Sequence, residues 1–248
     1  MENTEQPHIK VGKDTVNENI LLPGDPARVL IIAEEFENPT KIVENREYLG
    51  YNGEYKGIKV AAMSTGMGCP STLIAMEELA NIGVKNFVRI GTCGGLLPAM
   101  KSGDLIIPTA AIKPDGEMLG ADLRDTPVEG DKELLDAMIE AAEELGVTYF
   151  TGVNRTHDSF YESIEEFVKL KGKGLVSSEM ECAAVYLVGK QKGLKTGCIL
   201  VINTPEPPEE VEKNPDMIYQ LADKEAVKLG VENATKISLM ALKKVNSK

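Results

Sequence analysis

The chain has 248 residues, of which 42% are hydrophobic and 27% are charged, so wholesale disorder is excluded. Its 39 acidic residues outnumber 27 basic ones and give a net charge of -12, which argues against nucleic-acid backbones or anionic membranes as partners. Apolar runs are too short to span a membrane, the N-terminus lacks a secretory core, and four scattered cysteines predict a cytoplasmic protein without a zinc site.

Short apolar runs predict strands, and apolar residues at helical spacing predict helices. In chain order these are a strand at 19–22, a helix at 28–36, a hairpin within 46–65, a helix at 70–84, strands at 86–91 and 104–108, a helix at 131–145, a strand at 148–154, helices at 162–171 and 179–191, a strand at 196–202 and a closing helix at 216–244. Asn52-Gly53 predicts the turn of the hairpin. The Pro-rich, acidic segment 204–215 is predicted to be a surface loop, with a role as a lid left open. This alternation indicates one α/β domain over residues 1–248 with a mostly parallel sheet.

The segment GDPAR, residues 24–28, lies between a predicted strand and a predicted helix. Gly24 lets a ligand approach the backbone, a helix N-terminus attracts anions, and Arg28 offers a forked cation suited to phosphate. The alternative is a plain turn in which Asp25 caps the helix.

The segment STGMGCPST, residues 64–72, also precedes a predicted helix, where glycine-rich segments often hold phosphate or a nucleotide. Its spacing matches neither a P-loop nor the dinucleotide motif, so a site for a nucleoside triphosphate or a dinucleotide does not follow. A tight turn followed by a capped helix explains the segment equally well.

Two further segments carry charge into apolar surroundings. In RIGTCGG, residues 89–95, Arg89 interrupts an apolar strand, so it either meets a structural carboxylate or awaits an anionic ligand. Thr92 and the glycines after it favour a ligand, because α/β sites form at the carboxyl ends of strands. In SSEMECAAVY, residues 177–186, Glu179 and Glu181 flank Met180, and they fit either a helix dipole or the hydroxyl groups of a sugar.

In this order and spacing, the four segments resemble the nucleoside phosphorylase superfamily, which includes bacterial purine nucleoside and uridine phosphorylases. The resemblance extends from PHIKV at residue 7 to the closing helix. It implies that inorganic phosphate, a co-substrate, cleaves a nucleoside to ribose 1-phosphate and free base, with no metal and no organic cofactor. It also implies a single α/β domain with a mixed, partly barrel-like sheet flanked by helices. Dimers of this fold would assemble into a hexamer, with each active site at a dimer interface.

The resemblance assigns candidate roles motif by motif. The residues implied to bind phosphate are Gly24, Arg28, Arg46, Arg89 and Thr92. Those implied to bind ribose are His8, Met67, Met180 and Glu181, and those implied to bind the base are Cys93, Gly94, Phe160, Ser178, Glu179 and Asn203. Among these, His8 and Arg46 would reach the site of the neighbouring subunit. The catalytic candidates are Arg89, Glu181 and Asn203, and no metal ligand is expected.

Physical chemistry favours the same roles. A dianionic phosphate that attacks a sugar needs fixed cations, which Arg28, Arg46 and Arg89 would provide. A carboxylate on the sugar hydroxyls gains interaction energy as the sugar becomes cationic, which is the role expected of Glu181. The departing base gains negative charge, and the amide of Asn203 can donate a hydrogen bond to it.

The identity of the base depends on two departures from the family pattern. The stretch FYESIEEF, starting at Phe160, lacks the glutamine and arginine that uridine phosphorylases place there, which favours a purine. Asn203 falls where many purine-cleaving relatives have an aspartate, which favours a 6-oxopurine over adenosine but is compatible with uridine. The alternative is therefore a uridine phosphorylase. A methylthioadenosine-type nucleosidase and a non-catalytic nucleoside-binding protein are the more remote alternatives.

Overall fold

The structure, a computed structural model, describes residues 5–217 and 222–247. Its strands are β1 (Asn19–Pro23), β2 (Glu37–Asn45), β3 (Tyr48–Tyr55), β4 (Ile58–Met63), β5 (Asn86–Gly95), β6 (Leu105–Ile112), β7 (Glu117–Met118), β8 (Ala121–Asp122), β9 (Val128–Glu129), β10 (Tyr149–Thr156), β11 (Leu175–Glu179) and β12 (Lys195–Pro205). Its helices are α1 (Pro26–Ala33), α2 (Cys69–Asn81), α3 (Lys132–Leu145), α4 (Ile164–Val168), α5 (Cys182–Lys192), α6 (Pro208–Val211), the 3-10 turn Pro215–Met217 and α7 (Lys224–Asn246).

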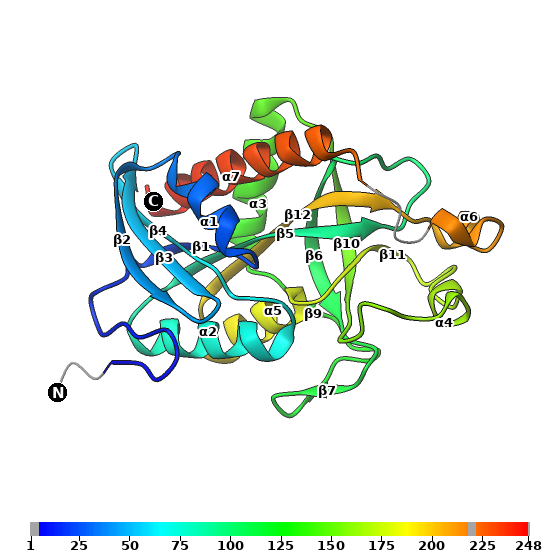
Figure 1. Cartoon of the computed structure of the whole chain (residues 1–248), viewed down its shortest axis with the longest axis horizontal. Helices are drawn as coiled ribbons and strands as arrows, with labels where there is room; N and C mark the ends of the chain where they lie inside the picture. Colours follow the sequence, from blue (N-terminus) through cyan, green and yellow to red (C-terminus); the bar gives the residue numbers. More distant parts are fainter. Residues whose placement is uncertain (1–4, 218–221, 248) are drawn as a thin grey trace.

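Five strands of the main sheet close into a barrel (Figure 1). The strand order is β11-β10-β6-β12-β5-β1-β4-β3-β2, and β11 also pairs with β5. In that second pairing Ser177 lies opposite Gly95 and Ser178 opposite Gly94, which closes the ring β5-β12-β6-β10-β11. The sheet is mixed, since β12 runs parallel to β5 and antiparallel to β6. The expected partly barrel-like sheet is confirmed, whereas the mostly parallel sheet expected from alternation alone is too simple.

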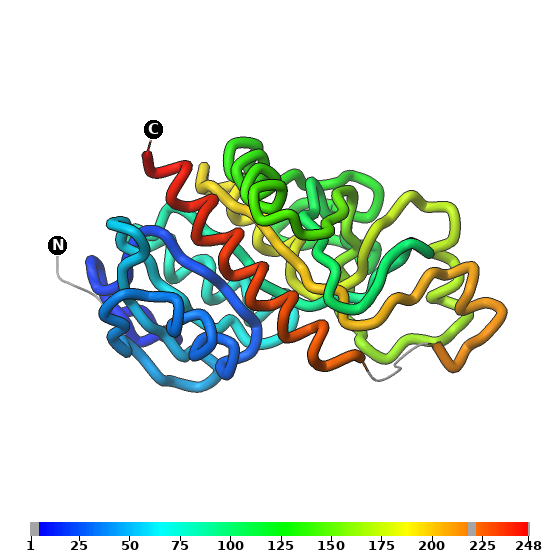
Figure 2. The backbone as a smooth tube through the Cα atoms, turned by 90° about the horizontal axis from the view of Figure 1, so that it is seen from above, coloured from blue at the N-terminus to red at the C-terminus, as the bar shows by residue number. Residues whose placement is uncertain are grey.

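Helices cover the sheet on two sides (Figures 1 and 2). Helices α1, α3 and α7 pack on one side through apolar residues such as Val29 and Ile237, and Figure 2 shows α7 crossing over the strands. Helices α2 and α5 form a second core on the other side, with Met76 and Val185. A smaller cluster around Leu200 fills the barrel region. The helices and these cores leave the strand ends free to build a site.

Helix α3 shows how local sequence sets an element. The side chain of Asp131 accepts a hydrogen bond of 2.9 Å from the backbone N–H of Leu134, which satisfies one of the free donors of the first turn. Gly146 ends the helix in the left-handed conformation, with a φ of 65°. The prediction of a helix over 131–145 is therefore confirmed to within one residue.

The predicted hairpin turn at Asn52-Gly53 is wrong. Both residues lie inside β3, and the chain turns at Lys56-Gly57, where the φ angles of 46° and 82° suit a two-residue hairpin turn. Gly53 instead allows close packing, because a Cβ atom there would lie 2.6 Å from the Cβ of Phe36. The glycine is required by a tertiary contact rather than by a turn.

Three other expectations need correction. The sequence did not predict β2 or β11, two strands of the main sheet. Segment 204–215 is more than a loop, because it includes the end of β12 and α6, whose Val211 is fully buried beside α4. The closing helix begins at Lys224 rather than at 216, and residues 218–221 of that prediction lie outside the described residues.

Candidate active site

A cavity of about 1000 Å³ opens at the ends of several strands. It is lined by residues at or just after the carboxyl ends of β1, β4, β5, β10, β11 and β12, so the four segments singled out in the sequence converge on one place. The predicted site residues in its wall are Gly24, Arg28, Met67, Arg89, Thr92, Cys93, Gly94, Phe160, Ser178, Glu179, Met180, Glu181 and Asn203.

The charge of Arg89 is paired inside the protein. Its side chain is only 4% exposed, and its Nε donates to Glu179 Oε2 at 3.1 Å. Its Nη2 lies 3.0 Å from Glu179 Oε2 and 2.5 Å from Glu181 Oε2. The expectation that Arg89 meets a carboxylate therefore holds, and because Arg89 also lines the cavity, a role toward phosphate stays a prediction.

Glu179 is held by the protein on every side. Its oxygens accept hydrogen bonds from Asn154 Nδ2 at 2.7 Å and from Thr156 Oγ1 at 2.8 Å. They also accept from the backbone N–H groups of Glu181 and Cys182, the start of α5. Glu179 therefore caps the helix and positions Arg89, and its contact with the base stays a prediction.

Glu181 has a different environment from Glu179. It carries no capping hydrogen bond to its own helix and instead accepts one of 2.6 Å from the backbone N–H of Gly68, in the glycine-rich segment. Burial raises the pKa of Glu181, and the neighbouring Glu179 adds to this although Arg89 opposes it. Burial would also raise the pKa of Glu179, but Arg89 and the two backbone donors bring it below its ordinary value. The two carboxyl groups thus differ in pKa because one has many more donors.

Arg28 brings an uncommitted positive charge to the cavity. Its Nη1 contacts the carbonyl oxygen of Ile90 at 3.4 Å, and among the described residues no carboxylate forms an ion pair with it. Burial, and then the charge of Arg89, lower its pKa from the usual value. Nearby, Asp25 caps α1 by accepting from Ala27 N–H at 2.9 Å, as the alternative interpretation of this segment required. The segment therefore serves both as a capped turn and as one wall of the cavity.

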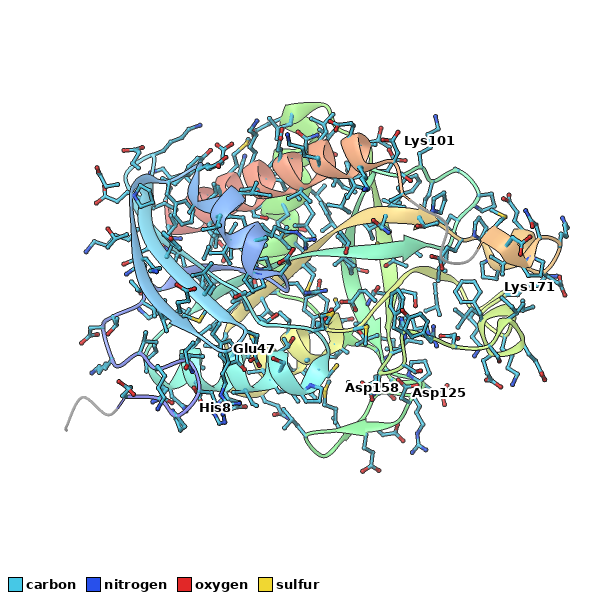
Figure 3. The ribbon with its side chains drawn as sticks, in the orientation of Figure 1. His8, Glu47, Lys101, Asp125, Asp158 and Lys171 are labelled. Carbon is cyan, nitrogen blue, oxygen red and sulfur yellow. The ribbon has the colours of Figure 1, made fainter. Side chains whose placement is uncertain are left out.

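Two predicted residues lie outside the cavity wall. His8 is 42% exposed, its Nδ1 lies 2.6 Å from Glu78 Oε1, and Figure 3 places it on the N-terminal segment. Arg46 is exposed at the turn between β2 and β3, with a φ of 54°. Its neighbour Glu47, labelled in Figure 3, does line the cavity. A carboxyl oxygen of Glu47 accepts a hydrogen bond of 2.8 Å from Ser71 Oγ. Within one chain, His8 and Arg46 therefore add nothing to this wall.

Asn203 reaches the cavity because β12 is irregular at this position. The pairing of β12 with β5 shifts register between Ile202 and Thr204, which leaves Asn203 as an extra residue. Such bulges re-aim a side chain while the strand continues. The backbone carbonyl oxygen of Asn203 accepts a hydrogen bond of 2.8 Å from Ser102 Oγ, and this bond fixes the backbone of the bulge.

Large apolar side chains gather at the mouth of the cavity. Met67 is 84% exposed, Phe160 54% and Tyr161 82%, and all three line the cavity. The rings of Phe160 and Tyr161 meet edge to face, with centroids 5.1 Å apart. Exposed aromatic and thioether groups of this kind suit a flat ligand such as a base.

The wall also holds polar residues that the sequence did not single out, among them Arg155, His157 and Glu206. Arg155 lies near the end of β10, one residue beyond the predicted strand, so it did not interrupt an apolar run as Arg89 does. Burial, and then Arg155, lower the pKa of His157, whose Nδ1–H donates to the Ser159 carbonyl at 2.8 Å. Glu206 was not singled out because it lies in the acidic segment 204–215, which was predicted to be a surface loop.

The known proteins to which this chain is similar are all phosphorylases in the comparisons below. The family model described as the phosphorylase superfamily matches residues 19–243. A guanosine phosphorylase of Halorubrum lacusprofundi is 35% identical over 96% of this chain and 98% of its own length, and a uridine phosphorylase of Thermococcus kodakarensis is 36% identical over 92% and 87%. A crystal structure of a purine nucleoside phosphorylase from Toxoplasma gondii, in complex with immucillin-H, is 30% identical, with a TM-score of 0.88 over 100% of this chain and 99% of that one.

Within the described residues, no helix combines the length and apolar character needed to cross a membrane. No group of three histidine, cysteine, aspartate or glutamate side chains there is arranged to hold a metal ion.

Proposed function

The chain belongs to the phosphorylase superfamily and is a nucleoside phosphorylase, and from this premise we propose that it acts on 6-oxopurine nucleosides. In this reaction an oxygen of inorganic phosphate attacks the anomeric carbon of the ribose. The bond from that carbon to the base nitrogen breaks, and its electron pair leaves with the base. The products are ribose 1-phosphate and the free purine.

The observation that carries this proposal is the guanidinium of Arg28, which lines the cavity and forms no ion pair with any carboxylate of the described residues. A cation kept near a second one, Arg89, is unfavourable without an anion, and phosphate supplies that anion. The N-terminus of α1, which begins at Pro26, adds partial positive charge at the same end of the cavity. Phosphate is therefore expected between Gly24, Arg28 and Thr92.

The remaining roles follow from what each group donates or accepts. Glu181 is proposed to hold the ribose hydroxyls and to stabilise the cationic sugar, since its carboxyl lies at the cavity wall beside Arg89. Asn203 is proposed to donate its amide N–H to N7 of the leaving purine. A neutral amide suffices when the purine carries an oxygen at position 6 that takes up part of the charge.

The assembly is proposed to be a homo-oligomer built from dimers, with a hexamer as the expected form. His8 and Arg46 lie outside the wall of their own chain's cavity, as residues that complete a neighbour's site would. Arg46 would then bring a third cation to the phosphate across the interface.

The test is a panel of inosine, guanosine, adenosine and uridine with and without phosphate. Base release should require phosphate, and Arg28→Gln should raise the KM for phosphate by on the order of 10–100-fold, because one charge-assisted contact is lost. The matched control is Arg124→Gln, since Arg124 is exposed, pairs with Asp122 and lies outside the cavity. Equal turnover without phosphate would favour a nucleosidase, and no turnover at all a nucleoside-binding protein.

Uridine is the second candidate substrate. It is favoured by the similarity to a uridine phosphorylase, which is as high as that to the guanosine phosphorylase. A wild-type kcat/KM for uridine above those for both 6-oxopurine nucleosides would overturn the purine assignment and leave phosphorolysis intact.

A further inference from the structure

One carboxyl group in the cavity receives no hydrogen bond from any residue that the structure describes. Glu206 directly follows β12, and its backbone N–H donates to the carbonyl oxygen of Gly95 at 2.7 Å, which holds it beside β5. Its carboxyl lies over Gly94: a Cβ atom on Gly94 would be 3.1 Å from one carboxyl oxygen and 3.3 Å from the other. Glycine at position 94 thus leaves the space that this carboxyl occupies.

Two arginines line the same cavity, Arg155 and Arg89, and both form ion pairs with other carboxylates. Arg155 donates through Nη1 to Glu162 Oε2 at 2.8 Å and through Nη2 to Glu162 Oε1 at 3.2 Å. Arg89 is held by its own two glutamates. Among the described residues none donates a hydrogen bond to the carboxyl of Glu206. Burial, and then the charge of Glu162, raise the pKa of Glu206 to about 7.

A partly buried carboxyl that receives no hydrogen bond from the described residues is held at a cost in the folded protein. Groups of this kind are typical of ligand sites, where the ligand supplies the missing partner. Glu206 lies between Gly94 and the segment that carries Phe160 and Glu162, which is the end of the cavity expected to hold the base. The missing donors are therefore expected on the base.

We propose that Glu206 is the specificity-determining residue of this site and selects guanine nucleosides by accepting two adjacent N–H groups of the base. This inference rests on the proposed phosphorolysis of 6-oxopurine nucleosides. The two oxygens of a carboxylate match two parallel donors, and guanine presents such a pair in N1–H and its 2-amino group.

Other bases satisfy this carboxylate less well. Hypoxanthine offers N1–H alone, and adenine has an acceptor at N1. Uracil has one N–H between two carbonyl oxygens, which would repel the carboxylate. Asn203 lies near the end of β12, and Glu206 directly follows that strand. The two residues are three positions apart, which is about 10 Å of extended chain. One purine ring can therefore contact both, with N7 toward Asn203 and its N1 edge toward Glu206.

The experiment compares kcat/KM for guanosine and inosine in the wild type, Glu206→Gln and the control Glu209→Gln. Glu209 lies in the first turn of α6, outside the cavity wall. We expect the wild type to prefer guanosine, and Glu206→Gln to lower the guanosine-to-inosine ratio by on the order of 10-fold or more, since a charged acceptor for two donors is lost. Glu209→Gln should leave the ratio within about twofold.

A second comparison needs no variant and covers a Glu206→Gln protein that fails to fold. With the wild type, 1-methylguanosine lacks the N1–H and should have a kcat/KM on the order of 10-fold or more below that of guanosine. An unchanged nucleoside ratio in folded Glu206→Gln, or equal turnover of guanosine and 1-methylguanosine, would overturn the role of Glu206 while phosphorolysis stands. Absence of phosphate-dependent turnover with every nucleoside would instead overturn the proposed function, and this inference with it.

Discussion

The carboxyl of Glu206 makes a prediction about stability that does not require substrate. Its pKa is raised from 4.5 to about 7 by burial and by Glu162. Below pH 4.5 the carboxyl is protonated in both the folded and the unfolded chain, so it has no differential effect. Between pH 4.5 and 7 the unfolded chain loses this proton and the folded chain keeps it, so stability falls as pH rises. Above pH 7 the penalty is constant.

The size of the penalty follows from the shift. A change from 4.5 to about 7 corresponds to at most about 3.5 kcal/mol, because one pKa unit is worth about 1.4 kcal/mol. Glu206→Gln removes the titration and nearly keeps the shape. We therefore expect a free energy of unfolding about 2–3 kcal/mol higher than that of the wild type at pH 8, and no difference at pH 4.5. For a chain of this size that corresponds to a rise in Tm of roughly 4–10 °C.

The assay is thermal unfolding of both proteins between pH 4.5 and pH 8 in the absence of nucleoside, with Glu209→Gln as the control. The difference in Tm between Glu206→Gln and the wild type should grow through the interval from pH 4.5 to 7. The same Tm difference at both ends of the range would refute the reasoning, as would a variant less stable than the wild type at pH 8.

Three other changes have defined outcomes. Glu181→Gln should lower kcat/KM by on the order of 100-fold, about 3 kcal/mol, since a preorganised carboxylate is lost from the sugar site. A kcat/KM within a few-fold of the wild type would show that Glu181 only pairs with Arg89. Asn203→Asp should shift the kcat/KM ratio of adenosine to inosine toward adenosine, most at low pH where an aspartic acid is protonated, and an unchanged ratio would exclude its contact with N7. Arg46→Ala and Arg28→Ala should each be weakly active at phosphate concentrations below the raised KM. The two variants should regain activity when mixed and reassembled, because some mixed interfaces then hold one intact site; no recovery in subunits shown to exchange would contradict a shared site.

Local sequence signals identified segments that line one cavity, but they identified the strands around that cavity less completely. The glycine-rich segments and the out-of-place charge of Arg89 are local signals, and the structure brings them to one cavity. The hairpin turn failed because Asn52-Gly53 has the chemistry of a turn but serves the packing of Phe36. The closure of the barrel joins β5 to β11, about 80 residues apart, and no local pattern specifies such a pairing.

The polar wall residues that the sequence did not single out show a second limit of prediction from sequence. Arg155 directly follows the predicted strand at 148–154, a position where a charge is ordinary, so it lacked the signal that singled out Arg89. Glu206 is one of several glutamates in a Pro-rich stretch, and only its position over Gly94 distinguishes it from them. Whether a carboxyl has a donor depends on the three-dimensional neighbours of the group, which the order of residues does not show.

The bulge at Asn203 has a consequence for how this enzyme can diversify. Because the extra residue takes no part in the regular pairing of β12 with β5, its side chain is not needed to hold the two strands in register. Exchanges at this position are therefore expected to leave the barrel intact while they change which leaving group is favoured. Glu179, by contrast, is tied to Arg89, to two polar side chains and to the start of α5, so its replacement would disturb all of them. If Asn203 contacts the base as proposed, single substitutions at the bulge are expected to change the base preference without disturbing Glu179 and its partners.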